Sequence, residues 1–198
     1  MIRDKSRSYY FGASDTKFIV GNWNTKTFCN WWLEKLGLNK NNFQNKYTLA
    51  GTNYEHRILD SLKITGLEKD NQIILDRLRV NLDGNTDKKI YEVKTFNNEN
   101  GFDIKKHKEY VQQVQVQMFA TKIYLAEIVA YGLKEEDYRN YFNEIDKDRL
   151  LEIEIEYDKE FIDNEYKPKL KYLTKCLKKG VFPNERAFQE EQIINWSI

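Results

Sequence analysis

The order of apolar and polar residues along the chain predicts several β-strands. Apolar residues alternate with charged or polar ones from Leu78 to Asp83, which is the period of a half-buried strand. A turn, DGNTDKK, then leads into IYEVKTF at 90–96, so we expect these two segments to form a hairpin. KIYLAEIVAYG at 122–132 has the composition of a central buried strand, and LLEIEIEYD at 150–158 alternates like an edge strand.

Other segments carry apolar residues at helical spacing. These segments are 14–36, 49–64, 104–121 and 161–177. Ser14 and Asn24 can each cap a helix in the first of them. The order of helices, hairpin, helix, two strands and a closing helix predicts an α/β (α+β) fold, with a central mixed β-sheet flanked by helices.

Composition and length fit one domain. The chain has 198 residues, 40% of them hydrophobic, and no Gly/Ser-rich linker, so we expect a single domain over 1–198. The net charge of +1 neither demands nor excludes a nucleic-acid partner. No segment approaches the roughly 20 apolar residues of a membrane span, and the N-terminus is polar. We therefore expect no membrane association and a cytoplasmic location.

Three charged residues stand on the predicted hairpin. Glu92 and Lys94 are two residues apart and share one face of their strand, and Asp83 lies across the turn from them. Two carboxylates could hold a hard divalent cation such as Mg²⁺, which takes oxygen ligands. The lysine could then stabilise charge on an attacked phosphate. Alternatively, all three are solvated surface charges, which is the usual state of a Glu/Lys pair on a strand.

Two further polar residues lie on or beside apolar helix faces. Glu55 falls within the apolar face of the 49–64 helix, where an unpaired carboxylate would be costly and a bound cation would remove the cost. Gln113 and Gln117 run along the flank of the 104–121 helix. Gln113 could hydrogen-bond a water or a phosphate, although the pattern alone favours a solvated flank. For His56 we expect a partly exposed position.

Basic residues suggest where phosphates could bind. The segment KKHK at 105–108 could line a phosphate-binding surface, because lysines supply sequence-independent affinity for nucleic acid. Arg7 precedes the helix that Ser14 could cap, and an arginine beside a helix N-terminus is a suitable anion site.

Four separated motifs in the right order resemble those of a known family. They are RSYYFGAS at 7–14, GTNYEHR at 51–57, LDG followed by YEVK at 82–94, and YVQQVQVQM at 110–118. Together they resemble the PD-(D/E)XK nuclease superfamily and, within it, the lambda-exonuclease-like or YqaJ-type viral recombinase branch, which includes the phage alkaline exonucleases. The resemblance implies a restriction-endonuclease-like core.

The resemblance also implies a role for each matching residue. Asp83, Glu92 and the backbone carbonyl of Val93 would bind Mg²⁺, or Mn²⁺ as a substitute, with Lys94 as the catalytic lysine. The other implied roles are support of the metal site by Glu55, an active-site glutamine at Gln113, and binding of the DNA 5′-phosphate by Arg7 and Ser14. The family pattern has a second aspartate on the first core strand, for which Asp76 is the nearest candidate, at a different spacing.

The implied activity is a Mg²⁺-dependent 5′-to-3′ exonuclease that degrades one strand of linear double-stranded DNA in phage-type recombination by single-strand annealing. The implied partners are double-stranded DNA ends, a single-strand annealing protein and further copies of the chain in a homotrimer. Two alternatives keep the fold: a site- or structure-specific endonuclease, and a non-catalytic DNA-binding or inhibitory protein.

Overall fold

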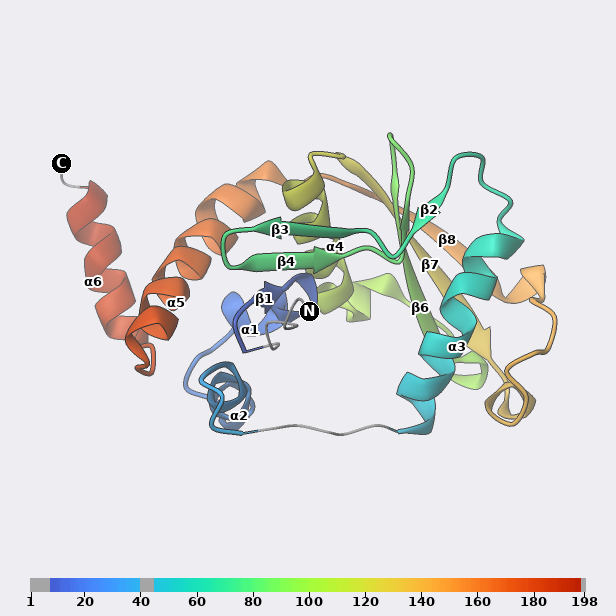
Figure 1. The fold of residues 1–198 in the computed structure, drawn as a ribbon, viewed down its shortest axis with the longest axis horizontal. Coiled ribbons are helices and arrows are strands. Elements are labelled where there is room, and N and C mark those ends of the chain that lie inside the picture. The colour runs from blue at the N-terminus through green and yellow to red at the C-terminus, as the bar shows by residue number, and fades with distance from the viewer. Residues whose placement is uncertain (1–7, 40–44, 197–198) are drawn as a thin grey trace, which may run out of the picture.

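Two β-sheets lie side by side at the centre of the molecule (Figure 1). The computed structural model describes residues 8–39 and 45–196, the last three by backbone alone. The smaller sheet has the order β1-β4-β3 and the larger one the order β2-β5-β6-β7-β8. The strands are β1 (Phe11–Gly12), β2 (Glu68–Lys69), β3 (Gln72–Leu75), β4 (Leu78–Asn81), β5 (Gly84–Asn85), β6 (Ile90–Asn97), β7 (Leu125–Leu133) and β8 (Leu150–Glu156).

The helices cover both faces of the larger sheet. They are α1 (Thr16–Ile19), α2 (Lys26–Lys35), α3 (Lys46–Ser61), α4 (Lys108–Thr121), α5 (Lys167–Lys179) and α6 (Glu185–Trp196), and a π-helical segment, Phe161–Tyr166, leads into α5. Helix α4 contacts both sheets and α1, whereas α3 packs against β6 from the opposite face. Among the described residues, no helix has the length and apolar character needed to cross a bilayer.

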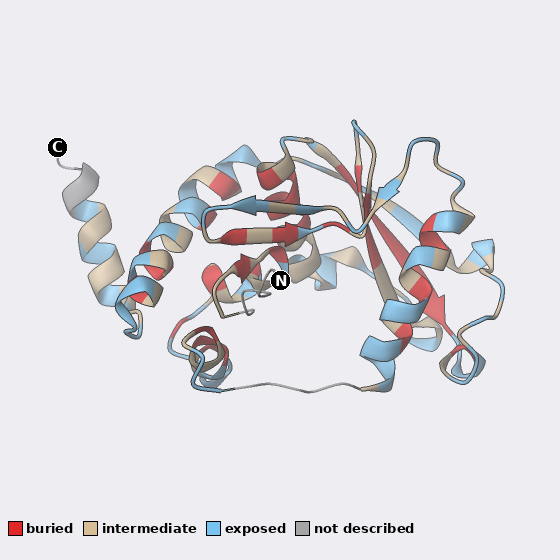
Figure 2. Ribbon diagram, viewed as in Figure 1, coloured by how far each residue is buried: buried red, intermediate tan, exposed pale blue. Residues whose placement is uncertain are grey.

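The larger sheet separates two clusters of buried residues, and Figure 2 colours the buried positions along the ribbon red. On the α4 side, Ile90, Ala126 and Ile128 belong to the main core. On the α3 side, Val93 and Val129 belong to a second core that includes residues of α3. Because β7 lies between β6 and β8 and is covered on both faces, it is apolar except at the buried Glu127, and it is the central buried strand that the sequence predicts.

The predicted hairpin is only partly correct. Strand β4 pairs with β3 and β1 rather than with β6. The chain turns at Asp76, whose φ is +50°, so 72–81 forms a β3–β4 hairpin of its own. It then crosses from the smaller sheet to the larger one, and only Gly84–Asn85 pairs with β6. A Cβ at Gly84 would lie 3.0 Å from a methyl group of Leu67, so glycine permits this close approach.

The helices also differ from the sequence prediction in detail. Ser14 does not cap a helix. It lies inside a 3₁₀ turn, Ala13–Asp15, where the Asp15 carboxylate accepts the Gly12 N–H at 2.8 Å. The cap of α2 is Thr25 rather than Asn24. The predicted helix at 104–121 is confirmed as a 3₁₀ turn followed by α4, whereas α6 was not predicted.

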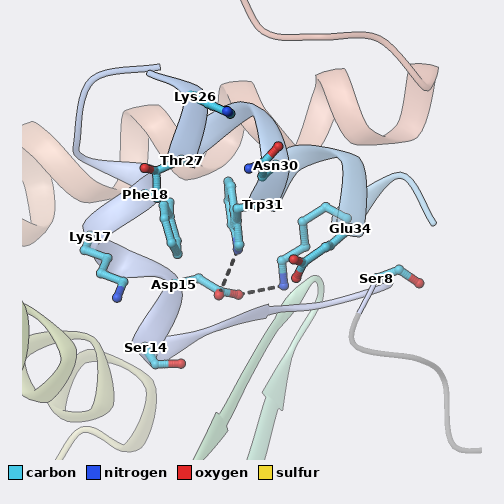
Figure 3. A pocket seen from close by; sticks show the side chains of 11 residues that line it. Ser8, Ser14, Asp15, Lys17, Phe18, Lys26, Thr27, Asn30, Trp31 and Glu34 are labelled. Atoms are coloured by element: carbon cyan, nitrogen blue, oxygen red, sulfur yellow. Dashed lines mark hydrogen bonds and ion pairs between the residues drawn. The ribbon is translucent and has the colours of Figure 1, made fainter. Parts of the chain in front are cut away.

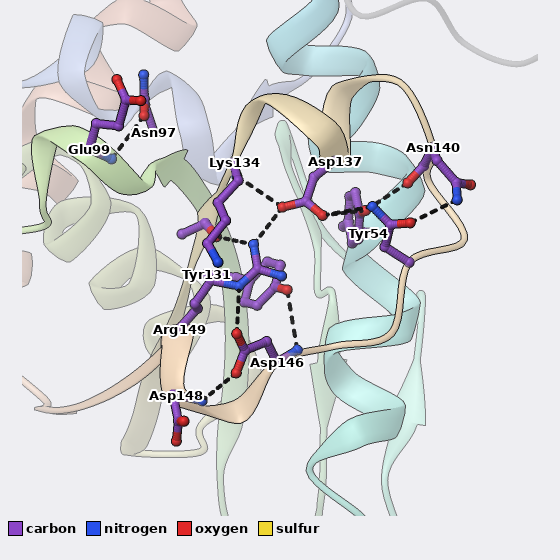
Figure 4. A network of polar contacts seen from close by, with 12 residues as sticks. Tyr54, Asn97, Glu99, Tyr131, Lys134, Asp137, Asn140, Asp146, Asp148 and Arg149 are labelled. Atoms are coloured by element: carbon purple, nitrogen blue, oxygen red, sulfur yellow. Dashed lines mark hydrogen bonds and ion pairs between the residues drawn. The ribbon is translucent and has the colours of Figure 1, made fainter.

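A buried polar network fixes α3 to the segment that follows β7 (Figure 4). Asp137 is buried and accepts hydrogen bonds from the Lys134 backbone N–H, from Arg149 and from the Tyr54 hydroxyl. Arg57, one turn farther along α3, donates to the backbone carbonyls of the same segment, including that of Asn143 at 2.6 Å. Since Glu55 lies between these two anchored residues, its position beside β6 is also fixed.

Candidate active site

Glu92 is the centre of the site. It lies in β6, is only 2% exposed and faces α4. Its Oε1 accepts hydrogen bonds from Lys94 Nζ at 2.5 Å and from Gln113 Nε2 at 2.6 Å, and its Oε2 accepts one from Gln117 Nε2. The structure therefore brings Glu92, Lys94 and Gln113 together. The alternative of solvated surface charges is wrong for the Glu92 and Lys94 pair.

Asp83 reaches the same strand from the crossing between the two sheets. Its Oδ2 accepts the backbone N–H of Val93 at 2.8 Å. In a strand the N–H and C=O of one residue point to the same edge, so the Val93 carbonyl also points to the edge beside Asp83. Beyond Tyr91, no strand of the described residues pairs with β6 on this side, and the edge is therefore open to a ligand.

Glu55 approaches the site from the α3 face. Burial raises the pKa of its carboxyl, and the charge of Glu92 raises that pKa further. Burial likewise raises the pKa of Asp83 well above its ordinary value, and the carboxylates of Glu92 and Glu55 add to this rise. The effects on these pKa values show that the three carboxylates lie within electrostatic range of one another.

The donor set fits a hard divalent cation. Carboxylate and carbonyl oxygens are the ligands that Mg²⁺ and Mn²⁺ prefer, and here Asp83, Glu92 and the Val93 carbonyl would hold the ion, with Glu55 behind them. Burial lowers the pKa of Lys94, but its pairing with Glu92 outweighs this and leaves the pKa raised, so the lysine is charged at neutral pH. One lysine against three carboxylates leaves an excess of negative charge that a cation would relieve.

A second group of possible metal ligands shares one of these residues. Glu55, His56 and Asp70 have ligand atoms within 4.8 Å of one another. His56 and Asp70 are both exposed and pair with each other at 3.0 Å, which accounts for their proximity. His56 thus has a surface position, close to what the sequence predicts.

A cavity of about 180 Å³ is lined by Asp83 and Gln113, among others. Ser14 lines the same cavity, so one of the two predicted phosphate-binding residues shares it with the Asp83 carboxylate. Arg7, the other one, lies outside the described residues. The cavity lining also includes Arg79 and Asn81 of β4, which the sequence pattern did not single out because they read as the polar face of a strand.

A larger cavity of about 510 Å³ adjoins the first one and shares Ser14 with it (Figure 3). The wall between the two is built on Asp15 and Lys35, a buried ion pair at 2.6 Å. Asp15 also accepts the Trp31 Nε1–H at 3.0 Å. This pair holds the 3₁₀ turn that carries Ser14 against α2. Nothing in the sequence distinguishes Lys35 from a surface lysine of an amphipathic helix.

Two sequence-based expectations differ from the structure at this site. Asp76 lies in the β3–β4 turn, at the opposite end of β4 from Asp83. The six residues between them span roughly 20 Å at about 3.3 Å per residue, which removes Asp76 from the site. The glutamine flank of α4 is not solvated: Gln117 is fully buried, and Gln113 is half-buried against Glu92.

Comparison with known proteins identifies the fold. No protein-family model matches the chain, and no curated protein matches it. Among solved structures, an alkaline exonuclease (LHK-Exo) from Laribacter hongkongensis is 19% identical with a TM-score of 0.67, over 96% of each chain. The same protein in complex with dAMP has a TM-score of 0.64 at 19% identity, over 87% of this chain and 92% of that one. A phage-related exonuclease from Haemophilus somnus is also 19% identical, with a TM-score of 0.60, over 86% and 92%.

The chain therefore has the fold of alkaline and phage-related exonuclease structures, over almost its whole length. The mixed α/β architecture predicted from the sequence is confirmed, and the resemblance noted from the four motifs extends to the fold.

Proposed function

We propose that this protein is a Mg²⁺-dependent deoxyribonuclease that degrades one strand of linear duplex DNA from its 5′ end. The observation that carries the proposal is the placement of Asp83, Glu92 and Lys94 together in and beside β6, where Asp83 lines a cavity that Ser14 also lines. Solved structures with the same fold are named as exonucleases, which favours this activity over other phosphodiester chemistry.

The proposal assigns a role to each residue of the candidate active site. Asp83, Glu92 and the Val93 carbonyl hold the cation, which supplies positive charge at the scissile phosphate when it is bound. Lys94, kept charged by Glu92, stabilises the negative charge that develops on the attacked phosphate. Gln113 donates to Glu92 and accepts from Lys94, so it holds the two side chains in place. Its amide N–H could instead donate to a phosphate oxygen of the bound DNA.

The cavity lined by Ser14 and Asp83 would favour binding of a DNA end. Ser14 supplies a hydroxyl donor and Arg79 supplies positive charge in a cavity that Asp83 also lines. A terminal 5′-phosphate bound there would place the first phosphodiester bonds near the carboxylates. Arg7 is proposed to contribute to the same phosphate site. A homotrimer and a single-strand annealing partner remain predictions from the family resemblance.

Cleavage of defined DNA substrates tests the proposal. In Mg²⁺ we expect the protein to resect a linear 5′-phosphorylated duplex and to leave a covalently closed circle of the same sequence intact. Asp83→Asn should reduce the rate by at least about 10²-fold, as is common when a charge-stabilising group is lost. The matched variant Asp76→Asn changes an aspartate outside the site and should cleave like the wild type.

The other outcomes separate the alternatives. Cutting of the closed circle would favour an endonuclease of the same fold. A wild-type protein that binds duplex DNA but cleaves neither substrate, in Mg²⁺ or Mn²⁺, would favour the non-catalytic alternative.

A further inference from the structure

Gln117 contacts both β6, which carries Glu92, and the end of β4, which precedes Asp83. It lies in α4 and is 0% exposed. Its Nε2 donates to Glu92 Oε2 and also approaches the backbone carbonyl of Asn81 at 3.4 Å. Glu92 belongs to β6 of the larger sheet, whereas Asn81 ends β4 of the smaller sheet, two residues before Asp83. One amide group therefore contacts both sheets at the point where they meet.

The other atom of this amide has no hydrogen-bond partner. Gln117 Oε1 is buried, and no donor in the described part of the chain reaches it. Turning the amide over would not help, because it would set an oxygen against two acceptors, the Glu92 carboxylate and the Asn81 carbonyl. A buried polar atom without a partner reduces stability, so this glutamine is not the side chain that would satisfy every hydrogen bond at this position.

The arrangement around Glu92 shows what the amide provides. A carboxylate offers about four lone-pair positions, two on each oxygen. Lys94 and Gln113 both donate to Oε1, whereas Gln117 alone donates to Oε2. The position left for a cation is therefore on Oε2, the oxygen whose direction Gln117 fixes.

We propose that Gln117 is a positioning residue that aims Glu92 Oε2 at the cation and holds the end of β4, and with it Asp83, at the matching distance. The inference rests on the proposed function, because it assigns Glu92 and Asp83 to one metal site. Gln117 itself touches neither the cation nor the DNA.

Gln115 is a matched control on the same helix. It is 4% exposed, and both polar atoms of its amide are bonded: Nε2 donates to the Glu156 carbonyl at 2.7 Å, and Oε1 accepts the Asp158 N–H at 2.7 Å. These bonds tie α4 to the end of β8, away from the carboxylates. Gln115 is thus a buried glutamine with a structural task alone.

The test compares Gln117→Met with Gln115→Met in the full-length protein. Three quantities are measured: the melting temperature in chelator, the affinity for Mn²⁺ without DNA by calorimetry, and the rate of cleavage of a linear duplex. For Gln117→Met we expect a Mn²⁺ affinity and a cleavage rate each lower by about 10- to 100-fold at temperatures where the variant is folded, the usual effect of losing a residue that orients a metal ligand. For Gln115→Met we expect a lower melting temperature, with Mn²⁺ affinity and cleavage unchanged at temperatures where the variant is folded.

The outcomes that overturn the inference are distinct. A Gln117→Met protein that binds Mn²⁺ and cleaves DNA like the wild type shows that the amide positions nothing. A Gln117→Met protein whose only defect is a lower melting temperature shows that the residue is structural. If the wild type binds Mn²⁺ but cleaves no DNA, the proposed function fails, while the difference in Mn²⁺ affinity between the two variants still tests the role of Gln117.

Discussion

Two lysines on and beside β6 show how neighbours assign different roles to the same residue type. The side chains of Lys89 and Lys94 are similarly enclosed, at 21% and 19% exposed. Lys89 bonds two carboxylates, Glu127 and Glu154, at 2.9 Å each, and these hydrogen bonds raise its pKa. Lys94 instead bonds one carboxylate, Glu92, and the neutral amide oxygen of Gln113. Its charge is therefore available to a phosphate, whereas that of Lys89 is used within the sheet.

Replacement of each lysine by methionine separates these roles. Lys94→Met should lower the cleavage rate by about 10²- to 10³-fold or more, because the developing charge on the phosphate loses its cationic partner. Lys89→Met leaves the Glu127 carboxylate, which is 8% exposed, without its cation. That variant should lose roughly 2 to 3 kcal/mol in the free energy of unfolding, somewhat less than is typical of a fully buried pair.

Cleavage assays at a temperature where both variants are folded, and urea unfolding curves, measure the two effects. Lys89→Met should cleave at the wild-type rate in that assay. Full activity in Lys94→Met would remove the lysine from the proposed mechanism.

At the residue scale, the sequence predicted what the period of a strand determines. Glu92 and Lys94 had to share a face because they are two residues apart, and Asp83 had to be near because a short turn separates it from β6. Burial of Gln117 could not be predicted, since it depends on how α4 packs where the two sheets meet. The ion pair of Asp15 and Lys35 was missed for a related reason: it joins a turn to a helix that is distant in sequence.

At the scale of elements, the strand composition predicted which strands are central and which lie at the edge, but not their partners. β7 is buried on both faces, with Glu127 as its one charged residue, and lies between two strands, as expected. The sequence predicts a strand from Leu78 to Asp83 that pairs with β6, yet β4 pairs with β3, because the chain folds back at Asp76 in a left-handed φ that aspartate tolerates better than most residues. The expected hairpin is thereby divided between two sheets, and the chain crosses from one to the other before Gly84.

The pairing of β7 with β8 gives a prediction on pH dependence. Burial raises the pKa of Glu152 in β8, and a side-chain hydrogen bond with Glu127 raises it further. A carboxyl whose pKa is higher in the folded state binds more protons there, so the stability falls as the pH rises from the unfolded pKa through the folded one. Glu152→Gln removes this loss. The variant should melt at a higher temperature than the wild type at neutral pH, and the difference should shrink as the pH falls toward 4.

Thermal unfolding measured across this pH range checks the sign. Glu154→Gln is the matched control, because Glu154 also faces Glu127 but bonds Lys89, so its loss removes a favourable contact. Glu154→Gln should give no stabilisation at neutral pH. A Glu152→Gln protein that is no more stable than the wild type at any pH would show that the two carboxyl groups do not interact.

At the scale of the whole molecule, the candidate site is the place where the two sheets meet. Asp83 lies on the chain crossing between the sheets, and it bonds β6 through the Val93 N–H. Glu55 comes from α3 on the far face of β6, and Gln113 comes from α4 on the near face. The sequence motifs named these residues one by one. Their meeting depends on packing across four elements, which no local pattern encodes.

A cation bound at this point should therefore stabilise the whole fold. Metal that binds only the folded protein adds RT ln(1 + [M]/Kd) to the free energy of unfolding, or about 2.7 kcal/mol at a free concentration 100 times Kd. For a protein of this size, that corresponds to a rise in melting temperature of about 5 to 10 °C. Mn²⁺ or Mg²⁺ should produce this rise in the wild type and in Asp76→Asn, and chelator should reverse it.

Asp83→Asn should lose most of the rise, while in chelator it should melt above the wild type at neutral pH, because the raised pKa of Asp83 makes its ionised form costly. If saturating Mn²⁺ leaves the wild-type melting temperature unchanged, the carboxylates at the junction do not form a metal site.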